Sequence, residues 1–254
     1  RPARAEPNTN TRQYSLMQTV DFRYFQLKDG DRVLDLGCGE GRHLIGALLA
    51  ADVQAVGVDL SHEDLVTGRH KTHDWAESVG EPRRPVLTQA SGYCLPFADN
   101  TFDAVICSEV LEHVPVVDKV LKEINRVLRP GGRLVISVPR RWPEQICWYL
   151  SADYHLQLGG HLRIFRLADL KRQIQALPVV FYYQHGAHAL HVPYWWLRCI
   201  FWNNPQAFPV RWYHKLLVWD LMKRPWLTRF IESLTNGWMG KSVVLYYRKQ
   251  DAAS

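Results

Sequence analysis

Several common sequence signals are absent from this chain of 254 residues. The five cysteines form no C-x-x-C pair, and several fall on predicted buried strands, which favours a reduced intracellular protein. No apolar run approaches the ~18 residues of a spanning helix, and no signal peptide is evident. Repeats, low-complexity segments and a second domain boundary are also missing. Together these absences predict a cytoplasmic globular protein that does not span a membrane.

Charge of either sign is not concentrated anywhere. The hydrophobic fraction of 47% and the charged fraction of 22% are ordinary for a globular protein. The net charge of +6 and the pI of about 9.1 permit a nucleic-acid surface, but the basic excess is modest and forms no run. A nucleic-acid partner is therefore the least favoured class, and the oligomeric state is left open.

The most informative stretch is Val33–Gly41, in which an apolar strand containing Asp35 runs into a glycine-rich loop. Glycine lets a backbone turn sharply and approach a ligand closely. A dinucleotide fingerprint, G-x-G-x-x-G, would place a third glycine at position 42, where this chain has Arg42. Asp35 would repel a pyrophosphate but would suit an ammonium or sulfonium group. The pattern therefore favours a cationic nucleoside. The three glycines are Gly37, Gly39 and Gly41.

A carboxylate follows the second predicted strand. The apolar residues 53–58 lead to Asp59, which lies 20 residues after Gly39. A carboxylate at this place in a parallel sheet accepts hydrogen bonds from the hydroxyls of a ribose. The alternative is that Asp59 merely caps the next helix.

Five separated motifs resemble the class I S-adenosylmethionine-dependent methyltransferases, specifically their type 11 branch, over about residues 28–139. The first two are the glycine loop and Asp59. The others are Leu95-Pro96-Phe97 with Asp99-Asn100-Thr101-Phe102-Asp103, Ser108-Glu109-Val110-Leu111-Glu112-His113-Val114, and Leu128-Arg129-Pro130-Gly131-Gly132.

The resemblance implies S-adenosyl-L-methionine as the cofactor. It places the glycine loop under the methionine part, Asp35 near the ammonium group and Asp59 on the ribose. Ser108 and Glu109 would border the methionyl chain and the transferable methyl group. The complete predicted cofactor-binding set is Asp35, Gly37, Cys38, Gly39, Gly41, Asp59, Leu60, Ser91, Gly92, Ser108 and Glu109.

One position departs from the family pattern. Relatives usually have an acidic residue four positions before the Leu-Pro-Phe motif, which accepts a hydrogen bond from the adenine amino group. Ser91 stands there. Because a hydroxyl is a weaker acceptor than a carboxylate, adenine would depend more on backbone groups near Gly92.

The coarse pattern alternates between strands and helices, as a doubly wound α/β sheet requires. The resemblance implies a Rossmann-like sheet of seven strands, with the last one antiparallel and beside the fifth. We expect strands at about 32–36, 53–59, 85–90, 102–108, 132–138, 178–184 and 242–248, and helices at about 41–50, 61–78, 116–128 and 167–176.

The region 188–240 is unusual for its aromatic content, because it holds seven of the ten tryptophans and a net charge of +4. We interpret it as a helical insertion between the sixth and seventh strands, covering the acceptor site. The methyltransferase core would then comprise 28–187 and 241–249, and 1–27 would be a partly flexible N-terminal segment. A helix over 211–224 should end at Pro225.

Three interpretations of this insertion remain open. The tryptophans could pack as an added helical layer, or they could contact a membrane surface, since Trp beside Lys and Arg is typical of interfacial helices. Stacking of nucleic-acid bases is the third. The insertion and the stretch 139–154 are both expected to line an apolar acceptor cavity.

These observations predict a methyltransferase that acts on a hydrophobic small molecule, lipid-like or a natural product, at oxygen. An RNA-modifying methyltransferase and a non-catalytic partner protein are the alternatives. A hydroxyl acceptor needs a base, and the candidate catalytic residues are His161, His188 and His113. His185, His188 and His191 lie within seven residues of sequence but have no acidic neighbour, so no metal site is predicted.

Overall fold

The computed structural model describes residues 18–156, 159–223 and 225–251. The predicted flexibility of the first residues concerns 1–17, which lie outside the described residues. The elements in chain order are α2 (Phe22–Phe25), β1 (Arg32–Leu36), α3 (Arg42–Ala50), β2 (Gln54–Asp59), α4 (His62–Val79), β3 (Val86–Gln89), β4 (Phe102–Ser108), α5 (Val117–Val127), β5 (Leu128–Pro139), α6 (Arg141–Leu150), α7 (Ala152–Leu156), α8 (Leu167–Gln175), β6 (Val179–Ala187), α9 (His191–Ile200), α10 (Phe208–Lys223), α11 (Trp226–Met239) and β7 (Ser242–Lys249).

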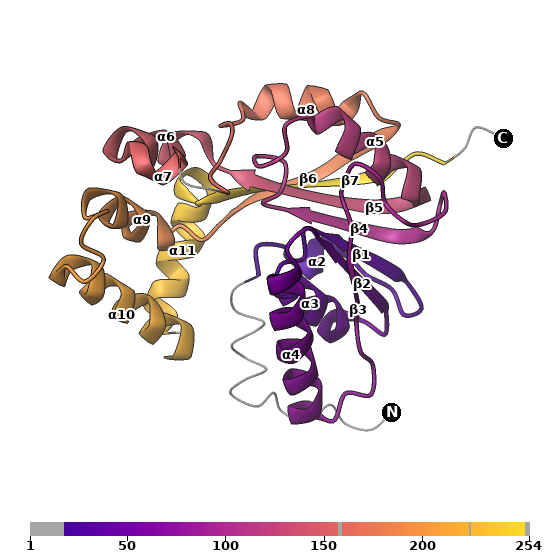
Figure 1. Ribbon diagram of the computed structural model, residues 1–254, viewed down its shortest axis with the longest axis horizontal. Coiled ribbons are helices and arrows are strands. Elements are labelled where there is room, and N and C mark those ends of the chain that lie inside the picture. The colour runs from indigo at the N-terminus through magenta and orange to yellow at the C-terminus, as the bar shows by residue number, and fades with distance from the viewer. Residues whose placement is uncertain (1–17, 157–158, 224, 252–254) are drawn as a thin grey trace.

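The strands form one seven-stranded sheet in the order β3-β2-β1-β4-β5-β7-β6. All neighbouring pairs from β3 to β5 are parallel, and β7 pairs antiparallel with both β5 and β6. The predicted fold class, a Rossmann-like doubly wound α/β sheet with an antiparallel last strand, is therefore confirmed. Helices cover both faces, with α5 and α8 on one side and α2, α3 and α4 on the other (Figure 1).

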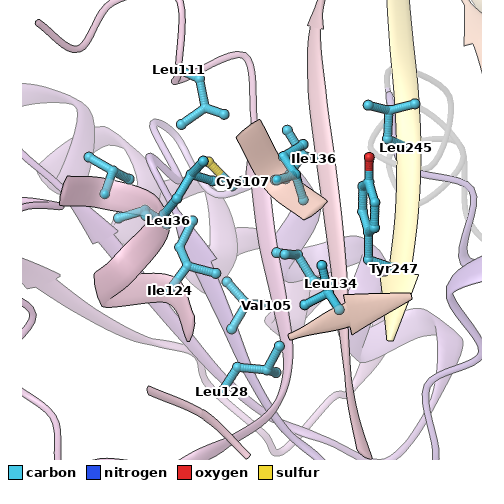
Figure 2. Packing of buried hydrophobic residues seen from close by; sticks show 14 of the residues in the cluster. Leu36, Val105, Cys107, Leu111, Ile124, Leu128, Leu134, Ile136, Leu245 and Tyr247 are labelled. Atoms are coloured by element: carbon cyan, nitrogen blue, oxygen red, sulfur yellow. The ribbon is translucent and has the colours of Figure 1, made fainter. Parts of the chain in front are cut away.

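The central strands are apolar on both faces because both faces are covered. Every residue of β4 is buried. Alternate residues of β4 belong to two hydrophobic clusters, one on each face of the sheet. Val105 and Cys107 pack in the first cluster, with α5 and α8. Ala104 and Ile106 pack in the second cluster, with α3. Figure 2 shows the first cluster, in which Leu134 and Ile136 from β5 meet Leu245 and Tyr247 from β7, among others.

Helix α5 shows how the spacing of apolar residues in the sequence determines which face of a helix is buried. Apolar residues recur three and four positions apart and all of them are buried. The charged residues between them lie on the exposed side or are only half-buried. The buried stripe consists of Val117, Val120, Leu121, Ile124 and Val127.

One edge of the sheet collects the residues of interest. The parallel strands β1, β2, β4, β5 and β6 all end there, and β7, which runs the opposite way, begins there. Loop residues after β1 and β4 and the residues just before β7 are consequently brought together, although they are far apart in sequence. This edge carries Gly37, Glu109, Arg140, His188 and Lys241.

Five helices outside the doubly wound core lie at this edge. Helix α6 follows β5 directly and packs against α7 and α9, and α9 packs against α10 (Figure 1). Helix α10 spans 208–223, close to the expected 211–224, and Pro225 precedes α11. The sequence predicts a helical region over 188–240, without the bounds of α9 and α11, and does not predict α6 or α7. The domain boundaries proposed above remain a prediction.

The tryptophans of 188–240 divide into two groups. Trp195, Trp196 and Trp202 pack around buried Cys147, Tyr154 and Cys199. A second group is exposed and consists of Trp212, Trp219, Trp226 and Trp238. Packing therefore accounts for only some of these side chains. Within the described ranges, no helix has the length and apolar character needed to cross a bilayer.

Candidate active site

The loop after β1 has the backbone geometry that requires glycine. Gly37, Gly39 and Gly41 have φ values of 72°, 48° and 84°. A Cβ at Gly37 would lie 2.3 Å from Cγ2 of Val110, so this position also has no room for a side chain. At Gly39, by contrast, no atom lies within 4 Å of where a Cβ would be. The loop is thus packed on one side and open at Gly39.

Asp59 fixes this loop to the end of β2. Its Oδ2 accepts a hydrogen bond of 2.8 Å from the Gly39 amide, and its Oδ1 accepts one of 2.9 Å from the Ser61 amide. Each carboxylate oxygen can accept a further bond, so Asp59 is able to hold the loop and a diol together. The adjacent Leu60 is 67% exposed.

Cys38 lies beneath the loop. Its amide donates to the carbonyl of Val58, and its side chain is buried against Gly57, where a Cβ would lie 2.7 Å from the sulfur. Burial raises the pKa of this thiol, so it stays protonated. The buried Cys38 side chain therefore supports the loop from the core side, and the place of Cys38 among the cofactor-binding residues stays a prediction.

Asp35 is a buried carboxylate that lacks a counterpart. Its side chain has no exposed surface, and neither oxygen has a hydrogen-bond partner within the described part of the chain. Burial raises its pKa to about 7, although the positive charge of Arg42 acts in the opposite direction and Asp59 adds to the rise. An unsatisfied buried acid calls for an explanation, and a cationic ligand group provides one.

Ser91 and Gly92 lie in a turn after β3. The Ser91 hydroxyl accepts a 3.3 Å hydrogen bond from the Tyr93 amide, and the Ser91 carbonyl accepts one from Cys94. Gly92 faces Leu36 and Val120, with room for a Cβ at ordinary contact distance. The half-buried Ser91 side chain is thus already used within the turn.

A chain of hydroxyl groups follows the end of β4. The Ser137 hydroxyl donates to Oε1 of Glu109 at 2.9 Å, and the Ser108 and Ser137 hydroxyl oxygens are 2.8 Å apart. Because Ser137 has a single proton to donate, Ser108 is the donor in the second bond. Glu109 has a φ of 57°, in a region that side chains rarely occupy. Ser108 and Glu109 are therefore held in one fixed arrangement.

Two of the three candidate histidines lie side by side. The His113 and His161 rings are 4.9 Å apart between centroids. Nδ1 of His161 is 2.5 Å from Oε1 of buried Glu144, which also accepts bonds from Trp148 and Tyr154. Although burial raises the Glu144 pKa, the bond to His161 holds it below its usual value. The result is an ordered histidine–carboxylate pair.

Backbone contacts attach the His161 segment to the turn after β4. The Leu162 amide donates to the Glu112 carbonyl at 2.9 Å, and Arg163 donates to the Pro115 carbonyl at 2.8 Å. Nδ1 of His113 lies 3.3 Å from the Gly160 carbonyl. These links place His161, which is 48 residues away in sequence, beside His113.

Glu112 completes this group. It has no exposed surface, and neither carboxylate oxygen has a hydrogen-bond partner among the described residues. Burial raises its pKa well above the usual value, and the charge of Glu109 adds to the effect. Its Oε1 is 3.9 Å from Nε2 of His113. Sequence analysis named the Glu112-His113 motif but assigned no role to the glutamate.

The third candidate, His188, lies elsewhere. It has a φ of 64°, its Nε2 is 3.3 Å from the Thr19 hydroxyl, and its ring is 5.3 Å from that of His191. Glu232 of α11 joins these two histidines, with ligand atoms within 4.8 Å of one another. The argument that no acidic residue accompanies this trio is thus wrong, because the carboxylate comes from a distant helix.

His185 does not join the other two. It lies within β6, and its Nε2 is 2.9 Å from the Tyr246 hydroxyl on the neighbouring strand. His188 and His191 come after the strand has ended and turn toward α11. The structure therefore separates the three histidines into one residue on the sheet and two beyond it.

A cavity of about 330 Å³ lies among α9, α10 and α11. Its walls are mainly apolar and aromatic and also include charged groups. Trp195 belongs to this wall and is 5.9 Å from Tyr154, which in turn is 6.1 Å from His161, between ring centroids. The apolar part of the lining consists of Tyr194, Trp195, Leu217, Val218 and Leu221, and the polar part includes His188, His191 and Glu232.

Sequence reasoning missed Glu144 and Lys241. Glu144 stands in a stretch noted only for its aromatic residues, and Lys241 precedes β7, with its Nζ 5.0 Å from the centre of the Trp195 ring. Neither belongs to a motif. Position was the one available signal. Glu144 follows β5 and Lys241 precedes β7, at the edge of the sheet where the other site residues lie.

Comparison with known proteins agrees with this geometry. The sheet order, with its antiparallel β7, is that of the methyltransferase architecture. Residues 34–136 match the family model for a methyltransferase domain. Residues 34–136, about two fifths of the chain, therefore carry a methyltransferase domain.

Two curated relatives share part of this domain. The chain is 37% identical over 111 residues to 27-O-demethylrifamycin SV methyltransferase of Amycolatopsis mediterranei, covering 44% of this chain and 39% of that protein. It is 32% identical over 130 residues to ubiquinone biosynthesis O-methyltransferase of Pseudomonas aeruginosa, covering 51% and 53%. The aligned region thus spans about half or less of these relatives.

A solved structure resembles nearly the whole chain. The [4+2]-cyclase SpnF aligns with a TM-score of 0.60 at 20% identity, over 91% of this chain and 79% of the cyclase. At this identity the likeness concerns the fold alone.

The packing of Gly37 generates a stability prediction. Gly37→Ala should lower the free energy of unfolding by roughly 2–4 kcal/mol, because the new methyl group meets Val110 and the left-handed backbone is strained. Gly39→Ala has the same backbone constraint without the clash, so it should cost only about 1 kcal/mol. Urea denaturation of both variants measures the difference, and equal losses would contradict the packing argument.

Proposed function

We propose that this protein transfers a methyl group from S-adenosyl-L-methionine to a hydroxyl oxygen of a hydrophobic small molecule. The observation that carries the proposal is the arrangement at the end of β1 and β2. It comprises an open glycine, a carboxylate able to hold a diol, and a buried acid with no hydrogen-bond partner among the described residues. This set of groups fits the ribose and the amino-acid part of the cofactor.

Different residues would hold different parts of the cofactor. Asp59 would accept hydrogen bonds from the ribose, with Leu60 against the base. Asp35 would face the ammonium group, and Gly39 would allow close approach of the chain. Ser91 accepts one hydrogen bond from the Tyr93 amide and keeps a second lone pair for the adenine amino group, as a weaker acceptor than a carboxylate.

The chemistry demands little covalent participation from the protein. When bound, the cofactor supplies a methyl group on a sulfonium sulfur, which is already activated for in-line displacement. The protein's part is to align the acceptor oxygen, to exclude water and to receive the acceptor's proton. Ser108, Ser137 and Glu109 form a fixed border after β4, and the pair of His161 and Glu144 is positioned to accept a proton.

The acceptor would place its apolar part among the helices at this edge. The cavity between α9, α10 and α11 is lined by aromatic and aliphatic side chains, as small-molecule sites commonly are. Trp195 and Tyr154 lead from this cavity toward His161. The names of two relatives, an O-methyltransferase and a rifamycin methyltransferase, support a small organic acceptor.

The cofactor assignment predicts a specific loss in Asp59→Ala. The wild-type protein should bind S-adenosylhomocysteine about tenfold more tightly than its 2′-deoxy analogue, because one hydrogen bond to a charged group is lost. Asp59→Ala should bind both weakly and should no longer distinguish them. Isothermal titration calorimetry measures all four affinities. A variant that still discriminates between the two ligands would rule out the ribose contact.

Asp35 predicts a pH dependence of cofactor binding. Its pKa of about 7 in the free protein means that it is protonated below that pH, while a cationic ligand favours the ionised form. Affinity for S-adenosylhomocysteine should therefore fall about tenfold for each pH unit below 7 and level off above it.

Asp35→Asn is the matched control for that profile. Its binding should be weak and independent of pH between about 5.5 and 8.5. Because the wild-type pKa is raised above the ordinary 3.8, ionised Asp35 reduces stability as the pH rises through about 7. Asp35→Asn should therefore unfold at a higher temperature than wild type at pH 8. A wild-type profile that is flat from pH 5.5 to 8.5 would contradict the role of Asp35.

We further propose that α10 and α11 contact an anionic membrane surface, which would suit a lipid-like acceptor. Both helices expose large apolar side chains, and exposed Arg211, Lys215 and Lys223 accompany them on α10. Aromatic rings beside cations are typical of interfacial helices. The exposed side chains include Phe208, Trp212, Trp219, Met222, Trp226, Leu227, Phe230, Leu234 and Trp238.

Sedimentation with anionic vesicles tests this contact. The wild-type protein should sediment with vesicles of phosphatidylglycerol and phosphatidylcholine, and Trp219→Ala with Trp226→Ala should reduce the bound fraction about tenfold or more. Tyr149→Ala is the control, because that side chain is 90% exposed on α6 instead. Equal sedimentation of the double variant would contradict the proposal. Salt-dependent binding to tRNA without vesicle binding would favour the RNA-modifying alternative.

A further inference from the structure

Glu112 is the least explained charged residue of the polar group beside β4. Its side chain is fully buried in the turn after that strand, and neither oxygen has a hydrogen-bond partner among the described residues. A buried acid in this state is costly unless it is paired or coordinates a metal. The nearest candidate partner, Nε2 of His113, is 3.9 Å from Oε1, which is too long for a hydrogen bond.

The distances among the side chains of Glu112, His113 and His161 fit a shared metal ion better than hydrogen bonds between these side chains. One ligand atom from each of Glu112, His113 and His161 lies within 4.8 Å of the others. Two atoms bound to one ion at ~2.0–2.2 Å lie roughly 3.3–4 Å apart. The Glu112–His113 distance already falls in this range, and small side-chain rotations would bring His161 to the same ion.

The outer contacts of both histidines have the pattern of metal-binding imidazoles. Nδ1 of His113 faces the Gly160 carbonyl at 3.3 Å, and Nδ1 of His161 faces the Glu144 carboxylate at 2.5 Å. A ring that donates from Nδ1 carries its lone pair on Nε2, which is then available to a metal. Carboxylates and backbone carbonyls are the groups that usually orient such ligands.

We propose that Glu112, His113 and His161 bind a divalent transition-metal ion, with Glu144 as the positioning residue for His161. Two imidazoles and one carboxylate suit a borderline-soft ion such as Zn²⁺ and leave at least one coordination position open. The hard ions Mg²⁺ and Ca²⁺ prefer sites made of oxygen ligands. The ion would offset the negative charge of Glu112 inside the protein.

The open position suggests a role that rests on the proposed function. With the ion bound, Nε2 of His161 is a ligand and not a base, and the ion takes over that role. An acceptor hydroxyl bound at the open position would lose its proton to solvent more readily, because the cation stabilises the oxygen anion. The oxygen lone pair would then form the bond to the methyl carbon, while the carbon–sulfur bond breaks and its electron pair returns to sulfur. The ion would thus select acceptors that carry a hydroxyl group.

A second group of similar composition provides a control within the same chain. His188, His191 and Glu232 also lie within 4.8 Å of one another, but none of the three is fully buried. Glu232 is paired with Arg229 at 3.0 Å, and Nε2 of His188 contacts Thr19. Its carboxylate and one imidazole therefore already have partners, and we expect this group to bind metal weakly.

The test is a titration of the full chain with Zn²⁺ after removal of metals by chelation. Calorimetry should show one tight equivalent in wild type, and Co²⁺ should give the visible absorption of a low-symmetry histidine site. Glu112→Gln and His161→Ala should each lower Zn²⁺ affinity at least tenfold, and Glu144→Gln should lower it about tenfold. His191→Ala should leave the affinity unchanged, and Mg²⁺ should not bind at this position.

Binding of S-adenosylhomocysteine to the same variants separates this inference from the proposed function. Retained cofactor binding shows that each variant is folded, so a loss of Zn²⁺ affinity can be assigned to the ligand set. Absence of Zn²⁺ binding in a protein that binds S-adenosylhomocysteine would overturn the metal site alone. Loss of the Zn²⁺ equivalent in His191→Ala, with retention in Glu112→Gln, would equally overturn it.

Discussion

The reversal of strand order between β1 and β4 is the constraint on which the site depends. Helix α3 follows β1 on one face of the sheet and α5 follows β4 on the other, so the two connections diverge and leave their strand ends uncovered. The glycine loop and the turn after β4 occupy this gap, and Val110 packs directly on Gly37. The cofactor loop and the Glu112–His113 turn are therefore two sides of one junction, and a change in either is transmitted to the other through a van der Waals contact.

Two acids on either side of this junction are buried and have no hydrogen-bond partner among the described residues. Asp35 and Glu112 are both fully buried, and burial raises the pKa of each. Such groups weaken a fold unless a ligand offsets their charge. The proposed ligands differ in kind, an organic ammonium for Asp35 and a metal ion for Glu112. The surrounding core, with every residue of β4 buried, supplies the stability that makes these two positions tolerable.

Local patterns in the sequence predicted most of the sheet, the glycine loop and α5, because strand and helix periodicities are set by neighbouring residues. Positions such as Glu144, Lys241 and Glu232 could not be predicted in the same way, since each reaches the site from a segment that carries no motif. The histidine trio shows the physical reason. His185 and His188 are three residues apart, yet the end of β6 at Ala187 leaves one on the sheet and turns the other toward α11. Which distant carboxylate meets a histidine depends on tertiary packing, and spacing in the sequence does not encode it.

The antiparallel strand has a consequence for how the chain folds during synthesis. Strand β7 lies between β5 and β6, so β6 has no partner in the sheet until β7 has been made. More than fifty residues separate the two strands, and they include α9, α10 and α11. During that interval an unpaired strand edge and the exposed aromatic helices would be present together on the ribosome, which is a combination that promotes misassembly. Late insertion of β7 therefore makes completion of the sheet one of the last steps of folding.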